Sequence, residues 1–382
     1  MRKLLVISIL FLFINSDFSN HGMKISAKTD FTKLTPLGVM ATAVDTKIAL
    51  SWEAVEGADG YEIYEAMSEA GNKTKFVVIG NTDKCLLVLN NKKRGTVYYY
   101  YIRAYKIDKS KPKNANNRKI FTKTGKEVST TVAPVGKSTV KNFLQTAISP
   151  IGSTMYVWGG GWGNDSKAGE SATRIGLSDK WRSFCKKQTS SYNYRKYLYR
   201  NNDGLDCSGF VGWTIYNVMN TKNNKKGYVY FSREQAEKLA DLGFGTYVRE
   251  NNVKNYKAGD IMSATCTNCG ECRHVWIVIG ECEDGSVVLV HSSVSGVQIS
   301  GTYSKDGKKK SMAYKLAKKY MEKYYPSWTK KYPVLCKDEK YLTHFSQMRW
   351  TTEGKNAVLS DPDGYRNMSV EEVLEDLFAE GE

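Results

Sequence analysis

A cysteine beside an aspartate, at the start of a predicted helix, is the residue best placed for chemistry in this chain. Residues 204–211 read GLDCSGFV: Asp206 suits a helix N-cap, and apolar residues follow at helical spacing. In a first helical turn, unpaired N–H groups and the helix dipole favour the thiolate of Cys207, which is the nucleophilic form. A buried structural cysteine would leave the same pattern, so this segment alone keeps both interpretations open.

Two of the four histidines suit a partner for this cysteine, because histidine is the usual base for a thiol nucleophile. His274 begins an apolar run at residues 274–280, and His291 ends a second run at residues 286–292. Both runs are typical of buried strands, and the glycine-containing segment between them is typical of a turn. We therefore expect a hairpin with one histidine on each arm. The other two histidines are His21 and His344.

The register of this hairpin decides whether its histidines can meet. With a two-residue loop at residues 284–285, they would share a face but lie four residues out of opposition, roughly 13 Å apart. We expect twist, a bulge or a wider turn to bring His274 and His291 together. Ser295 is the alternative orienting residue.

Taken together, these residues resemble the NlpC-type cell-wall cysteine peptidases, bacterial relatives of the papain fold. The resemblance covers roughly residues 140–350 and includes an aromatic–glycine motif, YVWGG, at residues 156–160. It implies an α+β papain-like domain with a central antiparallel sheet. It implies that Cys207 is the nucleophile, His274 the general base and acid, and His291 the orienting group.

The same resemblance implies three groove-lining residues: Asp206, Ser208 and Tyr156. A plain N-cap role would equally explain Asp206. The implied function is a peptidoglycan hydrolase that cuts stem peptides between D-glutamate and a diamino acid, without a cofactor. A muramoyl-L-alanine amidase, an acyltransferase and a wall-binding adhesin with an inactive peptidase domain remain alternatives.

An insert separates the glycine motif from the cysteine, at residues 164–203. It contains six aromatic residues: Trp181, Phe184, Tyr192, Tyr194, Tyr197 and Tyr199. We expect this insert to pack, and it is long enough to roof the cleft.

The eight cysteines leave a choice between disulfides and zinc. Cys207 must stay reduced, and Cys85 lies in an apolar strand run, where we expect it buried and free. The remaining six are Cys185, Cys266, Cys269, Cys272, Cys282 and Cys336. In an exported protein we expect them to form three disulfides. The rival is a zinc site, formed by Cys266, Cys269 and Cys272 with Cys282 as a fourth ligand.

The N-terminal third predicts export and a β-sandwich. Residues 1–27 have the charged start and short apolar core of a signal peptide, and no later stretch is long enough to span a membrane. We therefore expect a secreted or wall-associated protein. Residues 35–134 resemble a fibronectin type III domain, with Trp52 in its core and Tyr98 as its corner tyrosine. A spacer is the default role for such a domain, and a binding platform is the alternative.

The net charge of +17 predicts affinity for polyanions. For an exported protein we expect anionic wall polymers or acidic stem peptides as partners rather than nucleic acid. Positive charge concentrates at residues 106–126 and 305–331, where the second cluster includes a predicted amphipathic helix at residues 311–324. The peptidase domain is expected to span residues 140–355 and to end near a last strand at residues 345–350. Residues 356–382 follow as a turn and a short helix.

Overall fold

The computed structural model describes residues 30–44, 46–69, 72–93, 96–115, 117–132, 138–174, 176–219, 226–264 and 273–378. The predicted signal peptide lies outside these residues, as do Cys266, Cys269 and Cys272. In the part of the chain that is described, no helix combines the length and the apolar character needed to cross a bilayer.

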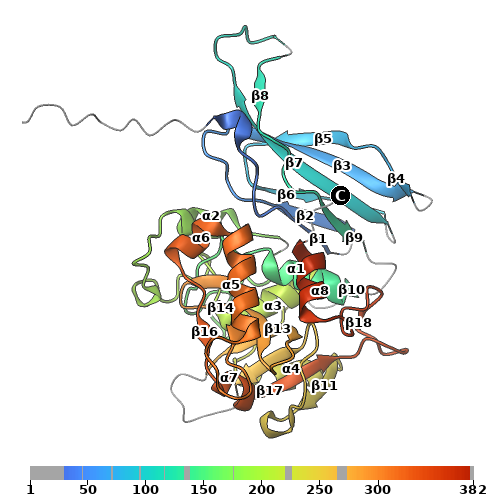
Figure 1. Cartoon of the computed structure of the whole chain (residues 1–382), viewed down its shortest axis with the longest axis vertical. Helices are drawn as coiled ribbons and strands as arrows, with labels where there is room; N and C mark the ends of the chain where they lie inside the picture. The colour runs from blue at the N-terminus through green and yellow to red at the C-terminus, as the bar shows by residue number, and fades with distance from the viewer. Residues whose placement is uncertain are drawn as a thin grey trace, which may run out of the picture.

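The first structural region is a sandwich of two β-sheets (Figure 1). One sheet has the order β1-β2-β6; the other has the order β4-β3-β7-β8, with β5 also pairing with β3 and β9 with β7. The strands are β1 (Met40–Val44), β2 (Lys47–Ser51), β3 (Gly60–Glu69), β4 (Asn72–Lys73), β5 (Val77–Thr82), β6 (Leu86–Leu89), β7 (Val97–Ile107), β8 (Lys119–Phe121) and β9 (Val128–Thr131). A short 3-10 helix, η1 (Phe31–Lys33), precedes them.

The alternation of apolar residues explains why the sandwich closes. Along β7, every second side chain from Tyr98 to Ala104 is buried, as the sequence predicts. Trp52 is buried in the same core, and the Tyr98 hydroxyl accepts a hydrogen bond from the backbone N–H of Lys93 at 2.8 Å. Both expected landmarks of the sandwich are therefore present.

The second structural region is built on a seven-stranded sheet with the order β11-β17-β12-β13-β14-β15-β16. Its neighbouring strands are antiparallel, except that β16 runs parallel to β15 at one edge. The strands are β11 (Gly245–Val248), β12 (Ile261–Ala264), β13 (Val275–Glu281), β14 (Val287–Ser293), β15 (Gly296–Thr302), β16 (Cys336–Lys337) and β17 (Phe345–Trp350). A small parallel pair joins β10 (Ser138–Thr139) to β18 (Leu359–Ser360).

Helices cover the sheet and bury one of its faces. They are α1 (Val140–Ile148), α2 (Asp179–Lys186), α3 (Cys207–Val218), α4 (Gln235–Asp241), α5 (Met312–Tyr324), α6 (Pro326–Lys331), α7 (Lys340–Thr343) and α8 (Val370–Phe378), with short 3-10 turns η2 (Tyr194–Lys196) and η4 (Glu250–Asn252). Odd-numbered residues of β13, such as Ile277, enter the main core with α1, α3 and α5. Even-numbered residues, such as Trp276, form a smaller cluster on the opposite face.

Helix α5 confirms the amphipathic segment, and its buried face includes the predicted one. The sequence places Met312, Leu316, Tyr320 and Tyr324 on one face, and all four pack against the main core, three of them partly exposed. The fully buried positions lie beside them, at Ala313, Ala317 and Met321. The small alanine side chains let the helix approach β15 closely, at Gly301, where an added Cβ would overlap the backbone of Ala313.

The C-terminal helix belongs to the same core. A reciprocal capping box starts α8: the Ser369 N–H donates to Glu372 Oε2 at 2.7 Å, and the Glu372 N–H donates to Ser369 Oγ at 3.3 Å. Val370, Leu374 and Phe378 are buried in the main core. Residues 356–378 therefore pack into the second region.

Helix α3 and the aromatic–glycine motif pack backbone against backbone, which predicts how much one added methyl group would destabilise the fold. An alanine Cβ at Gly209 would overlap the Gly160 carbonyl oxygen, whereas one at Gly163 would meet only an ordinary contact, 3.4 Å from Asp165 Oδ1. We expect Gly209→Ala to destabilise the fold by about 1–3 kcal/mol and Gly163→Ala to be nearly neutral. Urea unfolding of the full chain measures the difference. Equal stability of the two variants would contradict this packing.

Candidate active site

The start of α3 holds the candidate nucleophile as the sequence predicts. Asp206 is the N-cap: its Oδ1 accepts hydrogen bonds from the Gly209 N–H at 2.7 Å and the Ser208 hydroxyl at 2.9 Å. Its Oδ2 accepts from the Gly159 N–H at 3.2 Å. The carboxylate is buried, which raises the pKa of Asp206 to about 6 despite these hydrogen bonds. Its oxygens are thus used to hold the site together.

The aromatic–glycine motif lies directly beside this helix start. Tyr156 forms a parallel bridge with Leu205, and the Asp206 N–H donates to the Gly160 carbonyl oxygen at 2.9 Å. The phenol of Tyr156 is buried, and its pKa is raised by that burial and by the nearby Cys207 and Asp206 charges. Tyr156, Ser208 and Cys207 are therefore neighbours.

The two predicted strands form the expected hairpin, and its histidines meet. His274 Nε2 lies 2.8 Å from His291 Nδ1. The turn spans residues 282–286 and is wider than a two-residue loop, and the register shifts by one residue between Val278 and Gly280. Together these features place His291 opposite Trp276, only two residues from His274, so diagonal side chains can touch.

Two serines fix the hairpin in place. His291 Nε2 lies 3.1 Å from Ser300 Oγ on β15, and the Ser292 hydroxyl donates to the Leu205 carbonyl oxygen at 2.7 Å. The second bond ties β14 to the segment that carries Asp206 and Cys207. Ser295, the alternative orienting residue, lies in the turn between β14 and β15, whereas His291 makes the contact.

The Cys207 thiol lies against the histidine strand. The backbone N–H of Val275, the residue after His274, is close enough to stabilise the thiolate, as are the N–H groups of Cys207 and Ser208. Burial nevertheless dominates, and with the Asp206 charge it raises the pKa of Cys207. The N–H groups of the helix start thus favour the thiolate, as the sequence predicts, but desolvation outweighs them.

The histidine pair is held neutral. Burial, with a smaller contribution from the positive charge of Lys337, lowers the pKa of His274 to about 3. Burial, Lys337 and His274 likewise hold the pKa of His291 well below its ordinary value. At neutral pH the resting site thus contains a thiol and two uncharged imidazoles.

A cation and an aromatic ring from the C-terminal part of the sheet flank the histidines. The Tyr341 ring of α7 lies 5.8 Å from the His274 ring and 6.5 Å from the His291 ring, between centroids. Lys337 of β16 places its Nζ 5.8 Å from the centroid of Tyr341. The surroundings are desolvating, so the pKa of Lys337 falls to about 8.

The aromatic insert packs, as predicted, and divides into two parts. In α2, Trp181 is buried edge-on against Trp213 of α3, 5.7 Å between centroids. Further along, Tyr194 meets Tyr156 edge-on at 5.2 Å, and the Tyr192 hydroxyl donates to the Tyr156 carbonyl oxygen. The second part therefore packs against Tyr156, the residue that the sequence predicts to line a groove.

The structure confirms the prediction for Cys85 but not the predicted disulfides. Cys85 is buried and free, as expected, but Cys185, Cys282 and Cys336 are also free thiols. The expected set of three disulfides is therefore wrong, because these cysteines lie on α2, after β13 and on β16. Cys282 follows the end of β13 that lies away from His274, and this strand is about 23 Å long.

No group of three or more metal-ligating side chains occurs within the described ranges. The proposed ligands Cys266, Cys269 and Cys272 lie outside those ranges.

Sequence reasoning missed four residues at this site: Trp162, Ser300, Lys337 and Tyr341. Trp162 Nε1 donates to the Ser208 hydroxyl at 3.1 Å, and its ring lies 5.2 Å from that of Phe231. The alternation along residues 296–302 would have placed Ser300 on the face of a strand beside His291. No pattern in the sequence points to Lys337 or Tyr341.

Comparison with known proteins bears only on the sandwich. No family model matches the chain, and no curated protein matches it. Among solved structures, an Fn3-like protein from Clostridium thermocellum is 20% identical over 26% of this chain and 91% of its own, with a TM-score of 0.20. The fibronectin type-III domain of human fibronectin type III domain containing protein 3 is 18% identical over 28% of this chain and 94% of its own, with a TM-score of 0.21.

The charge of Lys337 predicts how His274 titrates. Because Lys337 is protonated below about pH 8, it opposes protonation of His274 throughout the acid range. We expect Lys337→Met to raise the His274 pKa above about 3, while burial, the larger cause, keeps it below 6.5, and Lys337→Arg to leave it unchanged. Histidine NMR titration of the folded chain measures both.

Acid unfolding should follow the same sign. Between pH 6.5 and about 3, His274 binds a proton in the unfolded chain but stays neutral in the folded chain. The free energy of unfolding therefore falls as the pH falls through this range. Lys337→Met should narrow the pH range over which His274 is protonated in the unfolded chain alone. An unchanged His274 titration in that variant would refute the role given to Lys337.

Proposed function

We propose that this chain is an exported peptidoglycan hydrolase whose second region is a papain-like cysteine peptidase domain of the NlpC type. It would cleave stem-peptide amide bonds, between D-glutamate and a diamino acid, by a thiol mechanism. The observation that carries the proposal is the 2.8 Å contact between His274 Nε2 and His291 Nδ1, beside a cysteine at a helix start.

The contact specifies how the proton would move. A neutral imidazole has one donor and one acceptor nitrogen. If Nδ1 of His274 accepts the Cys207 proton, Nε2 must carry a hydrogen and donate it to His291 Nδ1. His291 Nε2 then carries its own hydrogen toward Ser300 Oγ. This relay would fix the His274 tautomer without a carboxylate.

The proposed reaction has two steps. The Cys207 thiol gives its proton to His274 while the sulfur attacks the amide carbon. His274 then protonates the leaving amine, the C–N bond breaks, and a thioester remains. In the second step His274 takes a proton from water, the resulting hydroxide attacks the thioester, and the Cys207 sulfur recovers the proton as it leaves.

Burial keeps both reacting groups uncharged before the substrate binds. Because both Cys207 and His274 rest neutral, the ion pair would form only as the substrate arrives. The backbone N–H groups of Cys207 and Ser208 lie at the unpaired end of α3, where they support negative charge. The Cys207 N–H is the proposed oxyanion donor, and such a donor acts most strongly where water is excluded.

The groove would be lined by Tyr156 and Ser208, with Trp162 and Tyr194 beside them. Asp206 would act through the helix start, since both of its oxygens are occupied by hydrogen bonds. The sandwich would be a fibronectin type III spacer that holds the catalytic region at the wall. The basic surface would favour anionic wall polymers.

Replacement of the nucleophile tests the proposal. Cys207→Ala should abolish release of muropeptides from purified sacculi, measured by mass spectrometry, because no other group would form the thioester. Cys282→Ala is the matched control, since its free thiol follows the end of β13 that lies away from His274, and it should keep full activity.

The products also separate the alternatives. Muramic acid freed from L-alanine would indicate an amidase, and transfer to an added amine would indicate an acyltransferase. Wall binding without any product would favour an inactive adhesin. Activity retained in Cys207→Ala would overturn the thiol mechanism.

Replacement of each histidine should reduce the hydrolysis rate by a different amount. Loss of a general base costs on the order of two to four decades in rate, so His274→Ala should be nearly inactive. His291→Ala should have an equal or weaker effect, since it orients His274. His344→Ala is the control: its Nδ1 lies 2.7 Å from Thr343 Oγ1, and kcat/KM should stay near the wild-type value. An inactive His344→Ala variant would show that the assignment of the catalytic histidines to the β13–β14 hairpin is wrong.

A further inference from the structure

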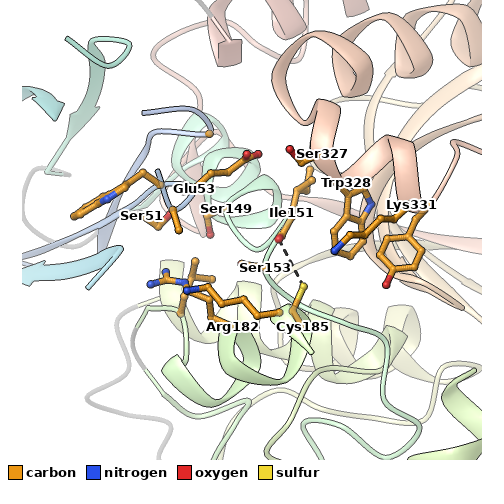
Figure 2. A pocket seen from close by; sticks show the side chains of 17 residues that line it. Ser51, Glu53, Ser149, Ile151, Ser153, Arg182, Cys185, Ser327, Trp328 and Lys331 are labelled. Atoms are coloured by element: carbon orange, nitrogen blue, oxygen red, sulfur yellow. Dashed lines mark hydrogen bonds between the residues drawn. The ribbon is translucent and has the colours of Figure 1, made fainter. Parts of the chain in front are cut away.

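A second cavity lies where the sandwich meets the catalytic region, away from the histidine pair. It has a volume of about 340 Å³, which falls in the range of small-molecule sites. Four segments line it: residues 51–54 of the sandwich, residues 149–153 after α1, helix α2 of the insert and helix α6 (Figure 2). The wall from α2 is fixed to the sandwich, because Arg182 donates to the Cys85 carbonyl oxygen at 2.8 Å.

The sandwich side of this cavity is acidic and desolvated. Glu53 lines it, and burial alone raises the pKa of that carboxyl to about 7. Within the described part of the chain, Glu53 Oε1 has no hydrogen-bond partner, and neither do the buried indole nitrogens of Trp52 and Trp328. Buried polar atoms are normally satisfied by protein, water or ligand, so the cavity leaves Glu53 without a donor and leaves the indoles of Trp52, on the sandwich, and Trp328, on α6, without acceptors.

The facing helices carry the positive charge. Arg182 and Lys186 of α2 and Lys331 of α6 line the cavity, and all three charges act on the thiol of Cys185 between them. Figure 2 shows Glu53 on the sandwich side and Arg182 with Cys185 on the facing helix. No ion pair joins any of these three cations to an acid among the residues that the structure describes. The cavity therefore has one acid on its sandwich side and three cations on α2 and α6.

This charge arrangement matches a ligand that carries both signs. A primary ammonium could bind the Glu53 carboxylate, and a carboxylate could bind Arg182 or the two lysines through charge-assisted hydrogen bonds. We infer that the cavity is a second, non-catalytic site for a short zwitterionic peptide, with its ammonium toward Glu53 and its carboxylate toward Arg182, Lys186 and Lys331. Its assignment to a wall stem peptide rests on the proposed function.

Such a site would explain why the insert docks on the sandwich. Residues 149–153 line the cavity and lead directly into Met155 and Tyr156 of the aromatic–glycine motif. A bound peptide would bridge the sandwich, α2 and α6, and would hold the two regions in one arrangement at the substrate.

Cys185 offers a reporter inside the cavity. Its free thiol can be alkylated with iodoacetamide in the full chain carrying Cys207→Ala, and peptide mapping measures the rate. The probe is the tripeptide L-Ala-γ-D-Glu-L-Lys with free termini. We expect a saturating probe to slow Cys185 labelling at least fivefold. Labelling of Cys336, which does not line the cavity, should stay unchanged.

Substitutions identify the groups that bind. Glu53→Gln and Lys331→Gln should each remove the protection, while Glu56→Gln and Lys330→Gln, which alter neighbours outside the cavity, should keep it. Protection lost with a probe acetylated at its amines would support the role of Glu53. Unchanged Cys185 labelling, or equal protection in all four variants, would overturn the inference even if wild-type protein hydrolyses sacculi. Protection without hydrolysis would instead leave this site standing and refute the proposed function.

Discussion

The buried carboxylate of Asp206 is the constraint on which the arrangement of the candidate site depends. It caps α3 through Gly209 and Ser208, and it holds the aromatic–glycine motif through Gly159. A buried acid at this position is costly unless its oxygens are satisfied. The glycines at residues 160 and 209 allow the close approach that satisfies them. One side chain therefore positions the start of α3, the aromatic–glycine motif and the proposed nucleophile Cys207.

The strands and the site residues were predictable because each leaves a local pattern. Alternation along residues 98–104 and the two apolar runs that end in histidines predicted β7, β13 and β14 within a few residues. The pairing of His274 with His291 needed the bulge after Val278, which no local pattern specifies. Lys337 and Tyr341 reach the histidines only through the parallel strand β16 at the sheet edge, so the sequence alone could not place them.

The electrostatics of the site and the cysteine pairing depend on burial and on tertiary distance, which local patterns in the sequence do not specify. A helix start lowers the pKa of a thiol where water still reaches it, but Cys207 is enclosed and the opposite shift results. The expectation of disulfides for Cys185, Cys282 and Cys336 rests on the exported compartment and on the even number of remaining cysteines. The fold places them on three separate elements, as free thiols. Of these, Cys185 lies in the cavity between the two regions, so the insert bridges them as well as packing against Tyr156.

The central claim is that Cys207 forms a covalent bond with its substrate. The most direct measurement is rapid acid quenching of wild-type protein during turnover of a soluble stem peptide, followed by peptide mapping of the trapped species. The account predicts that the peptide containing Cys207 gains the mass of the acyl fragment, as a thioester that hydroxylamine removes. Hydrolysis that proceeds with no adduct, or with an adduct on any other residue, would contradict it.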